Sequence, residues 1–222
     1  MIDLTKFMSR HFHQNRELGS LDLHLKQEIL TSLECFELTQ YLQNITDWKG
    51  GDYLGRSIKR YQRWYHMEQS YFCKDWPEFD RWHSYKYDDK LLALQQQIYD
   101  VSKKMLDTEI EMFDSILINY YPTGKEIIPR HRDSEAIFGD NPVIAVLSLG
   151  TTRTMKFTEI EPDVRSLKKV PDGKEFEHQL NPNSLLIMSG TMQKYYSHEI
   201  LPETEETGPR YSLTFRKHKD QK

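Results

Sequence analysis

The sequence predicts an α+β protein whose core is a jelly-roll barrel or β-sandwich with one helix packed outside it. Two patterns lead to this fold class. After Asp114 the chain is a series of short hydrophobic stretches separated by turn residues, which is typical of antiparallel strands. Before that point, residues 89–110 carry apolar side chains at spacings of three and four, as in an amphipathic helix. This helix is expected to cover one face of a sheet.

The strands are expected in the second half of the chain, over a core of about residues 114–217. Turn-forming sequences such as Pro122-Thr123-Gly124 and Gly208-Pro209 separate them. The expected strands are 115–121, 143–149, 154–158, 176–180, 184–189, 195–200 and 210–215.

The first part of the chain is less regular. Residues 1–20 are polar, so we expect an arm that precedes a single domain over 21–222. Residues 35–42 resemble a short amphipathic helix, and Gly50-Gly51 is expected to break it. Residues 56–82 are rich in aromatic and basic side chains without clean periodicity, which favours irregular hairpins or a lid over the barrel.

Composition narrows the class of protein. With 37% hydrophobic and 29% charged residues in a chain of 222, one globular core is expected. The net charge of -4 excludes a surface that is cationic overall, which counts against tight non-specific binding to nucleic acid. The two cysteines, Cys35 and Cys73, make neither a disulfide framework nor a thiolate metal site. Without a long apolar segment, an intracellular, soluble protein is expected, nuclear or cytoplasmic.

A metal site is indicated by the His131-x-Asp133 pair. In a strand, residues two apart project to the same side, so both side chains can point at one ion. A third ligand can come from His178 or His198. We favour His198, because it follows an aromatic strand and precedes the last one, whereas His178 is flanked by polar residues and is expected to face solvent. Two histidines and one carboxylate leave iron positions open for a co-substrate and O2.

Two arginines after His198 suggest the co-substrate. A 2-oxo dicarboxylic acid needs a guanidinium for its far carboxylate and further donors for its near one. Arg210 with the Tyr121 hydroxyl can supply the first. Arg216 with Asn119 can supply the second.

Several of these motifs occur in the order found in a known family. Residues from about 60 to 217 resemble the AlkB family of nucleic-acid dealkylases, close to its vertebrate repair members. The stretches 143–150 and 184–190 resemble that family's core strands. The matching motifs are Asn119-x-Tyr121, His131-x-Asp133, His198 and Arg210-x-Ser212-x-Thr214-Phe215-Arg216.

One position departs from the family pattern. Ser212 stands where the family has asparagine. A hydroxyl donates one hydrogen bond but is shorter than an amide. The change either weakens the affinity for the co-substrate or is offset by a water molecule.

The resemblance implies a double-stranded β-helix, the jelly-roll of Fe(II)- and 2-oxoglutarate-dependent dioxygenases, behind an N-terminal aromatic and basic substrate lid. It implies Fe(II) bound by His131, Asp133 and His198. Oxidation of an N-alkyl group with O2 would yield formaldehyde, succinate, carbon dioxide and the repaired base. The residues it implies for 2-oxoglutarate are Asn119, Tyr121, Arg210, Ser212 and Arg216.

The resemblance also suggests residues for the substrate. Residues 60–65 resemble the start of the lid, where Arg60 and Arg63 can hold phosphates on either side of Gln62. Tyr71 or Phe72 is the expected ring for stacking on a flipped base. Glu135 lies where the family has a base-reading acid. The alternative for the lid residues is an aromatic cluster that caps the barrel. The alternative for Glu135 is a loop carboxylate exposed to solvent.

Three functions therefore compete. The first is a demethylase acting on alkylated DNA or RNA, for example on 1-methyladenine or 3-methylcytosine. The second is a 2-oxoglutarate oxygenase that modifies a protein or a small molecule, which the acidic net charge favours. The third is a catalytically silent jelly-roll that binds a partner. We expect the first, acting as a monomer, with the choice of DNA or RNA, strand type and base left open.

Overall fold

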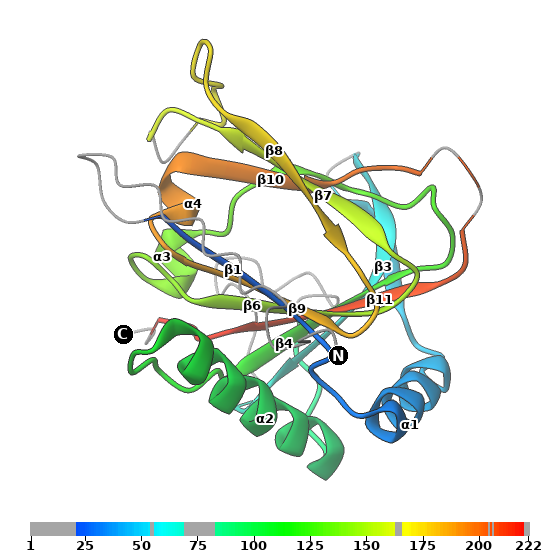
Figure 1. Cartoon of the computed structure of the whole chain (residues 1–222). Coiled ribbons are helices and arrows are strands. Elements are labelled where there is room, and N and C mark those ends of the chain that lie inside the picture. Colours follow the sequence, from blue (N-terminus) through cyan, green and yellow to red (C-terminus); the bar gives the residue numbers. More distant parts are fainter. Residues whose placement is uncertain are drawn as a thin grey trace, which may run out of the picture.

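A computed structural model describes residues 21–53, 56–68, 83–162, 166–203, 205 and 207–219. Two antiparallel sheets face each other, and two helices cover the outer face of the larger one (Figure 1). This arrangement is the jelly-roll that the sequence predicts, with the outer helix in the expected place. Among the described residues, none of the helices has the length and apolar character needed to cross a membrane.

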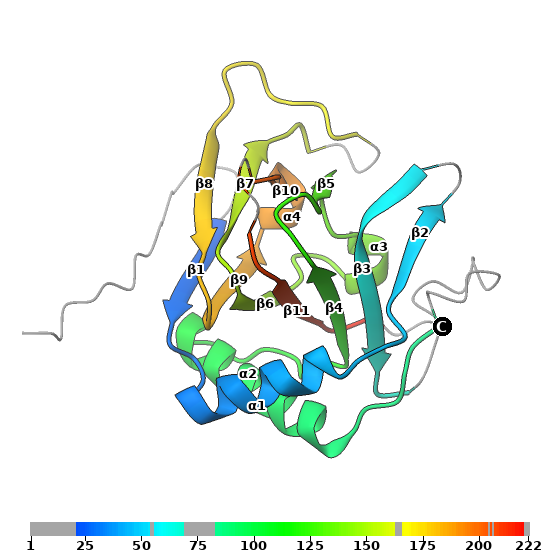
Figure 2. The ribbon, with the colours of Figure 1, turned by 90° about the vertical axis from the view of Figure 1, so that its right-hand side faces the viewer.

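The large sheet has the strand order β1-β9-β6-β11-β4-β3-β2. Its strands are β1 (Leu21–Gln27), β2 (Lys49–Tyr53), β3 (Arg56–His66), β4 (Ser115–Tyr121), β6 (Ile144–Gly150), β9 (Ser184–Gly190) and β11 (Arg210–Arg216). The β2–β3 hairpin forms one edge of this sheet (Figure 2).

The small sheet has the strand order β5-β10-β7-β8. It lies above the large sheet in Figure 1. Its strands are β5 (Ile128–His131), β10 (Tyr196–Ile200), β7 (Arg153–Glu159) and β8 (Glu175–Leu180).

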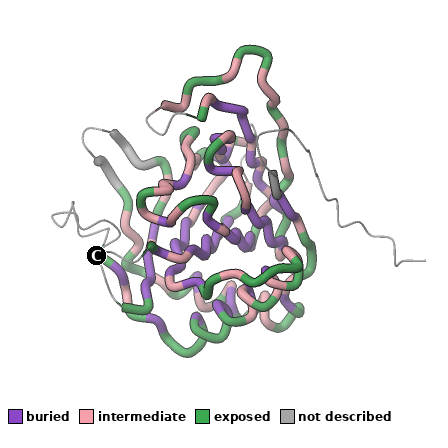
Figure 3. Tube along the Cα trace, turned by 90° about the vertical axis from the view of Figure 1, so that its left-hand side faces the viewer, coloured by how far each residue is buried: buried purple, intermediate pink, exposed green. Residues whose placement is uncertain are grey.

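Strand alternation divides the core into two layers. On β6, Ala145 and Leu147 belong to the hydrophobic cluster beneath the large sheet, whereas Ile144 and Val146 belong to the cluster between the sheets. Successive side chains of a strand point to opposite faces, so a strand buried on both faces is hydrophobic throughout. Buried residues accordingly concentrate in the central strands, and the outer loops and helix surfaces are exposed (Figure 3).

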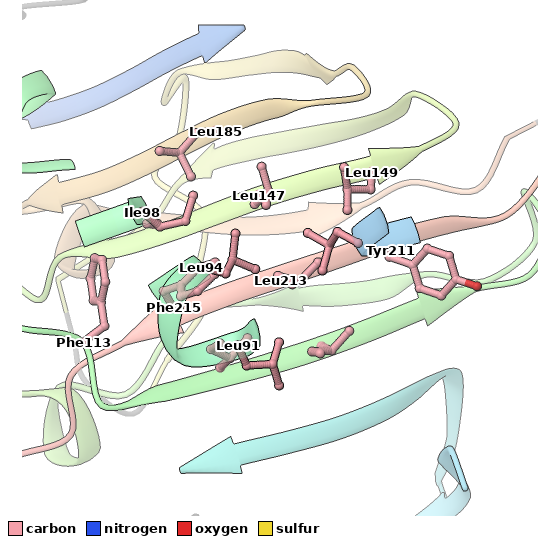
Figure 4. Close-up of a cluster of buried hydrophobic side chains, with 14 of the residues drawn as sticks. Leu91, Leu94, Ile98, Phe113, Leu147, Leu149, Leu185, Tyr211, Leu213 and Phe215 are labelled. Atoms are coloured by element: carbon pink, nitrogen blue, oxygen red, sulfur yellow. The ribbon is translucent and has the colours of Figure 1, made fainter. Parts of the chain in front are cut away.

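The long helix α2 (Asp89–Leu106) closes the lower layer. Its start is fixed by Asp88, whose Oδ1 accepts a hydrogen bond of 2.9 Å from the backbone N of Leu91. Leu91, Leu94 and Ile98 lie against the apolar face of the large sheet (Figure 4). Full burial of such a side chain is worth about 1.5–3 kcal/mol. The shorter helices are α1 (Ser32–Gln43), α3 (Glu135–Phe138) and α4 (Met192–Tyr195).

The first half of the chain differs from the sequence prediction. Of residues 56–82, for which irregular hairpins or a lid were predicted, 56–66 form strand β3, which pairs with β2 in a hairpin and with β4 over 61–66. Residues 21–27, for which no element was predicted, form β1 and pair with β9. Gly50 and Gly51 lie in β2, and the preceding helix has already ended at Gln43. The predicted arm 1–20, the remainder of the lid from 69 to 82, and with it Tyr71 and Phe72, lie outside the described residues.

Candidate active site

A cavity of about 160 Å³ lies between the two sheets. It brings together side chains that are far apart in the sequence, from β3 and β4 through to β11. The polar residues that line it are Arg60, Gln62, Asn119, Tyr121, His131, Asp133, His198, Ser212, Thr214 and Arg216.

The two predicted histidine ligands are neighbours. His131 on β5 and His198 on β10 are paired across the small sheet, and their ring centroids are 4.3 Å apart. Burial lowers the pKa of the His198 ring to about 3, and the nearby His131 adds to the effect. Burial likewise lowers the pKa of His131. Both rings are therefore neutral at pH 7, the form in which imidazole binds a metal.

The tautomer of His131 is set by its own strand. Its Nδ1 lies 3.0 Å from the carbonyl oxygen of Pro129. A carbonyl only accepts, so Nδ1 carries the proton and donates it. Nε2 keeps its lone pair, as in histidines that ligate metals through Nε2.

Asp133 supplies an ionised carboxylate to the same cavity. Burial by itself raises the pKa of this carboxyl, but the Arg216 guanidinium together with His198 and His131 outweighs it, and the pKa is lower than usual. Oδ1 accepts a hydrogen bond of 2.9 Å from Nη2 of Arg216. Oδ2 is buried and has no hydrogen-bond partner among the described residues. A buried carboxylate oxygen without a partner is costly unless something else binds it, and a metal ion fits that need.

Arg210 on β11 is paired directly with Tyr121 on the neighbouring strand β4. The guanidinium is completely buried and lies 5.0 Å from the centroid of the Tyr121 ring. Nη2 donates to Ser148 Oγ at 2.9 Å, whereas Nε, Nη1 and the Tyr121 hydroxyl have no hydrogen bond within the described part of the chain. Burial lowers the pKa of Arg210, yet a guanidinium stays charged. A buried cation with unused donors fits a carboxylate ligand.

A family model described as "2OG-Fe(II) oxygenase superfamily" matches residues 22–216. The chain belongs to this superfamily. The donor set just described suits the two groups in that description, iron through Asp133 with the two histidines and 2-oxoglutarate through Arg210.

Curated relatives of this oxygenase confirm the resemblance to AlkB proteins. The alpha-ketoglutarate-dependent dioxygenase alkB homolog 3 of Mus musculus is 31% identical over 124 residues, which are 54% of this chain and 41% of that protein. Its Homo sapiens counterpart is 34% identical over 109 residues, with 47% and 36% covered. The DNA oxidative demethylase ALKBH2 of Arabidopsis thaliana is 29% identical over 146 residues, with 60% and 45% covered. The chain thus spans less than half the length of each relative.

Solved structures share the fold of this oxygenase. The structure of OsALKBH1 superimposes with a TM-score of 0.61 at 17% identity, covering 88% of this chain and 97% of that one. The alpha-ketoglutarate-dependent epimerase SnoN superimposes with a TM-score of 0.59 at 10% identity, covering 88% and 78%. At these identities the likeness concerns the jelly-roll alone.

Arg60 and Arg63, which were both predicted to hold phosphates, lie on opposite faces of strand β3. Arg60 and Gln62 line the cavity of the oxygenase, where Arg60 Nε donates to Asn119 Oδ1 at 2.7 Å. Arg60 is thus engaged inside the site, and its contact with a phosphate stays a prediction. Arg63, one position out of phase, forms an ion pair with Asp47 and lies 3.6 Å from the centroid of the Tyr85 ring. That Arg63 holds a phosphate stays a prediction.

The structure also gives the positions of Glu135 and His178. Glu135 is the first residue of α3, is half-buried and does not line the cavity. His178 does not face solvent as expected, since it is half-buried and packs against Phe157 and Phe176 at centroid distances of 6.1 and 5.8 Å. That burial lowers its pKa.

Gln193 is a residue at the site that the sequence did not reveal. It is buried on α4, and its Oε1 accepts a hydrogen bond of 2.9 Å from the backbone N of Asp133. The turn before β10 therefore holds the segment after β5. Glutamine in a short turn carries no sequence signal for such a role, because it is usually exposed.

A second group of potential metal ligands lies elsewhere in the oxygenase. His66, Asp114 and His218 each offer a ligand atom within 4.8 Å of the others. Asp114 Oδ1 lies 3.0 Å from His218 Nδ1, and Lys217 Nζ lies 3.0 Å from Oδ2. The backbone N of Glu68 donates to His66 Nδ1 at 3.1 Å, so the proton of that neutral ring is on Nε2, which faces Asp114 at 3.8 Å. These contacts already engage both carboxylate oxygens of Asp114.

Proposed function

We propose that this chain is an Fe(II)- and 2-oxoglutarate-dependent oxidative demethylase that removes N-alkyl groups from bases of DNA or RNA. The observation that carries the proposal is the ionised Asp133, whose buried Oδ2 has no hydrogen-bond partner among the described residues and which shares its cavity with His131 and His198. Neutral imidazoles and one carboxylate are the donors of a facial iron site. The curated names of the relatives, dioxygenases of the alkB type and a DNA oxidative demethylase, support the reaction.

His131, Asp133 and His198 would hold the iron. When bound, Fe(II) with 2-oxoglutarate and O2 supplies the oxidising power that turns an N-methyl group into an unstable N-hydroxymethyl group, with succinate and carbon dioxide as co-products. The chain's own part is to fix the ligands. Pro129 holds the ring of His131 in one tautomer, and Arg216 holds the carboxylate of Asp133 in one orientation.

The co-substrate would lie along β4 and β11. Arg210 and the Tyr121 hydroxyl present unused donors to its far carboxylate. Asn119 and Ser212 face each other in the register of these strands and line the cavity, where they can donate to the near carboxylate. Arg216 already forms an ion pair with Asp133. Its main proposed role is therefore to hold that carboxylate, and a contact with 2-oxoglutarate is an additional one.

Water exclusion is the other contribution of the chain. The cavity wall includes Leu117, Val146, Met155 and Met188 next to the polar residues. Apolar walls keep water from the reacting atoms and strengthen the electrostatic contacts inside.

The substrate base would enter from the side of β3. Gln62 and Arg60 line the cavity and can contact polar atoms on the edge of a base. A base in a duplex must leave the stack to reach such a site, whereas a single strand need only bind. Glu135, two residues after Asp133, remains our proposed base-reading acid, and Tyr71 or Phe72 the proposed stacking ring.

A second candidate is an oxygenase of the same chemistry that acts on a protein or small molecule. The net charge of -4 favours it, because nucleic-acid binding is driven by cationic surfaces. Both candidates share the iron and co-substrate residues, so only the substrate distinguishes them.

The deciding experiment is a turnover assay of the protein with Fe(II), ascorbate and 2-oxoglutarate. Single- and double-stranded oligonucleotides with 1-methyladenine or 3-methylcytosine serve as substrates, DNA and RNA in parallel, and mass spectrometry follows loss of the methyl group. Demethylation that depends on both iron and 2-oxoglutarate is expected. Succinate formation without any repaired base would favour the second candidate, and absence of both from folded, metal-loaded protein would overturn the oxygenase proposal.

A further inference from the structure

Arg153 is an unexplained buried charge. It is the first residue of β7, and none of its surface is accessible to solvent. A buried guanidinium costs several kcal/mol of desolvation unless its surroundings compensate for it. It does not line the cavity and has no part in the iron chemistry described above.

The hydrogen bonds of Arg153 connect the loop before β5 with the end of β10, and these two strands carry His131 and His198. Nη2 donates to the carbonyl oxygens of Glu126 and Leu201, both at 2.6 Å, and Nη1 to that of Thr123 at 3.3 Å. Thr123 and Glu126 lie in the loop between Tyr121 and β5, and Leu201 directly follows β10. One guanidinium therefore fixes the end of the strand that carries Tyr121 relative to the two strands that carry the histidines.

The packing around this junction is tight. The backbone N of Glu203 donates to the carbonyl oxygen of Gly124 at 2.9 Å. A Cβ atom on Gly124 would lie 2.9 Å from Cβ of Glu203, which is too close for any real side chain. The two loops that Arg153 joins consequently have little freedom to separate.

Arg153 also acts through its charge. Its Cζ lies 5.4 Å from the centroid of the Tyr121 ring, and Cζ of Arg210 lies 5.0 Å from the same centroid. Glu203 Oε1, 3.4 Å from Nε, offsets only part of the charge of Arg153, because the Glu203 side chain is 28% exposed and partly solvated. The remaining positive charge matches one carboxylate beside Tyr121, and it is weakly screened because both guanidiniums are buried.

We propose that Arg153 is a positioning residue that makes the co-substrate pocket selective for a dicarboxylic 2-oxo acid. It holds Tyr121 and adds positive potential where the far carboxylate of 2-oxoglutarate binds. This inference rests on the proposed role of Arg210 and Tyr121 in binding that carboxylate.

The test compares two ligands that differ only at the far end. 2-Oxoglutarate ends in a carboxylate, and 2-oxopentanoate has a methyl group in its place. Each is titrated calorimetrically into Mn(II)-loaded protein, so that binding is measured without turnover. The variants are Arg153→Met and Arg153→Lys, and Arg130→Met is the control because Arg130 is exposed on β5. Thermal unfolding checks that each variant is folded.

Arg153→Met is expected to lower the affinity for 2-oxoglutarate by about 10- to 100-fold and to leave that for 2-oxopentanoate nearly unchanged. Arg153→Lys, which keeps the charge without the forked donors, should recover part of the loss. Arg130→Met should bind both ligands as the wild type does. An equal loss for both ligands would mean that Arg153 only supports the fold, and this would overturn the proposal.

A second variant covers the case in which Arg153→Met fails to fold. Glu203→Gln keeps Arg153 but removes the charge that offsets it, so the affinity for 2-oxoglutarate should rise or hold while that for 2-oxopentanoate is unchanged. A selective fall in 2-oxoglutarate affinity in Glu203→Gln would contradict the proposal. Wild-type protein that binds Mn(II) but not 2-oxoglutarate would instead overturn the co-substrate site itself, and this inference with it.

Discussion

Nη2 of Arg216 lies 2.9 Å from Oδ1 of Asp133, although the two residues are separated by 83 positions in the chain. Both side chains are buried, with 8% of each exposed. The contact leaves Oδ2 of Asp133 as the buried oxygen without a hydrogen bond in the described part of the chain. Arg216 therefore decides which oxygen of the carboxylate is available for a metal.

Replacing Arg216 by methionine should weaken metal binding by about 10- to 100-fold, the usual effect of losing a partner of a metal ligand. Without the guanidinium, burial would also raise the pKa of Asp133 and favour its protonated form. Titration of Mn(II) into the protein measures the change, with Arg130→Met as a matched arginine control on the surface. Unchanged Mn(II) affinity in Arg216→Met would show that Asp133 orients itself.

Asparagine substitutions should distinguish the two groups of potential metal ligands. Asp133→Asn is expected to abolish Fe(II)-dependent turnover and high-affinity Mn(II) binding, because the amide offers a neutral, weaker ligand. Asp114→Asn is expected to retain both, because its partners are Lys217 and His218 rather than a metal. Metal content by mass spectrometry after Fe(II) loading checks the result. The reverse pattern would move the iron to the His66 group.

Arg210→Met should raise the KM for 2-oxoglutarate by about 100-fold, since charge-assisted hydrogen bonds to a buried carboxylate are strong. Ser148→Ala removes only the hydroxyl that accepts from Arg210 Nη2 and should have a much smaller effect. Initial rates of succinate formation over a range of 2-oxoglutarate concentrations give both values. Similar KM values for the wild type and Arg210→Met would place the far carboxylate elsewhere.

Asp114 should make stability depend on pH. Burial by itself raises the pKa of this carboxyl, but its hydrogen bonds with His218 and Lys217 outweigh burial, and the pKa in the folded state is lowered. Its contribution, about 1–3 kcal/mol, should be complete above the unfolded-state pKa near 4 and disappear as the pH falls through the folded-state value. Urea unfolding of wild type and Asp114→Asn at several pH values between 7 and 3 measures it. A difference in unfolding free energy that does not shrink on acidification would contradict this assignment.

Much of the barrel could be predicted from the sequence because its strands are short and bounded by turn residues. The prediction of 115–121 coincides with β4, and the other predicted strands differ from the observed ones by one residue at most at either end. The alternation of Leu21, Leu23 and Leu25 was a usable signal for β1 that the polar neighbours obscured. Strand β3 was harder to predict, because its aromatic and basic residues occur on both faces.

Some of the residues in and around the cavity could likewise be predicted from the sequence, and others could not. His131, Asp133 and His198, which the sequence suggested because metal chemistry restricts the residue types, all line the cavity. The different fates of Arg60 and Arg63 follow from strand phase, which an irregular segment does not reveal. The burial of Arg153 depends on carbonyl groups of two distant loops, and no local pattern contains that information.

The position of β11 has a consequence for the order of assembly. This strand follows all the other described strands in the chain, yet it lies between β6 and β4 inside the large sheet. It carries Arg210, Ser212 and Arg216, and its pairing partners are contributed by segments synthesised much earlier. Closing such long loops is slow in folding. β11 can therefore enter the centre of the sheet only after its two neighbours have been synthesised, and Ser212, Thr214 and Arg216 reach the cavity only when this last described strand is inserted.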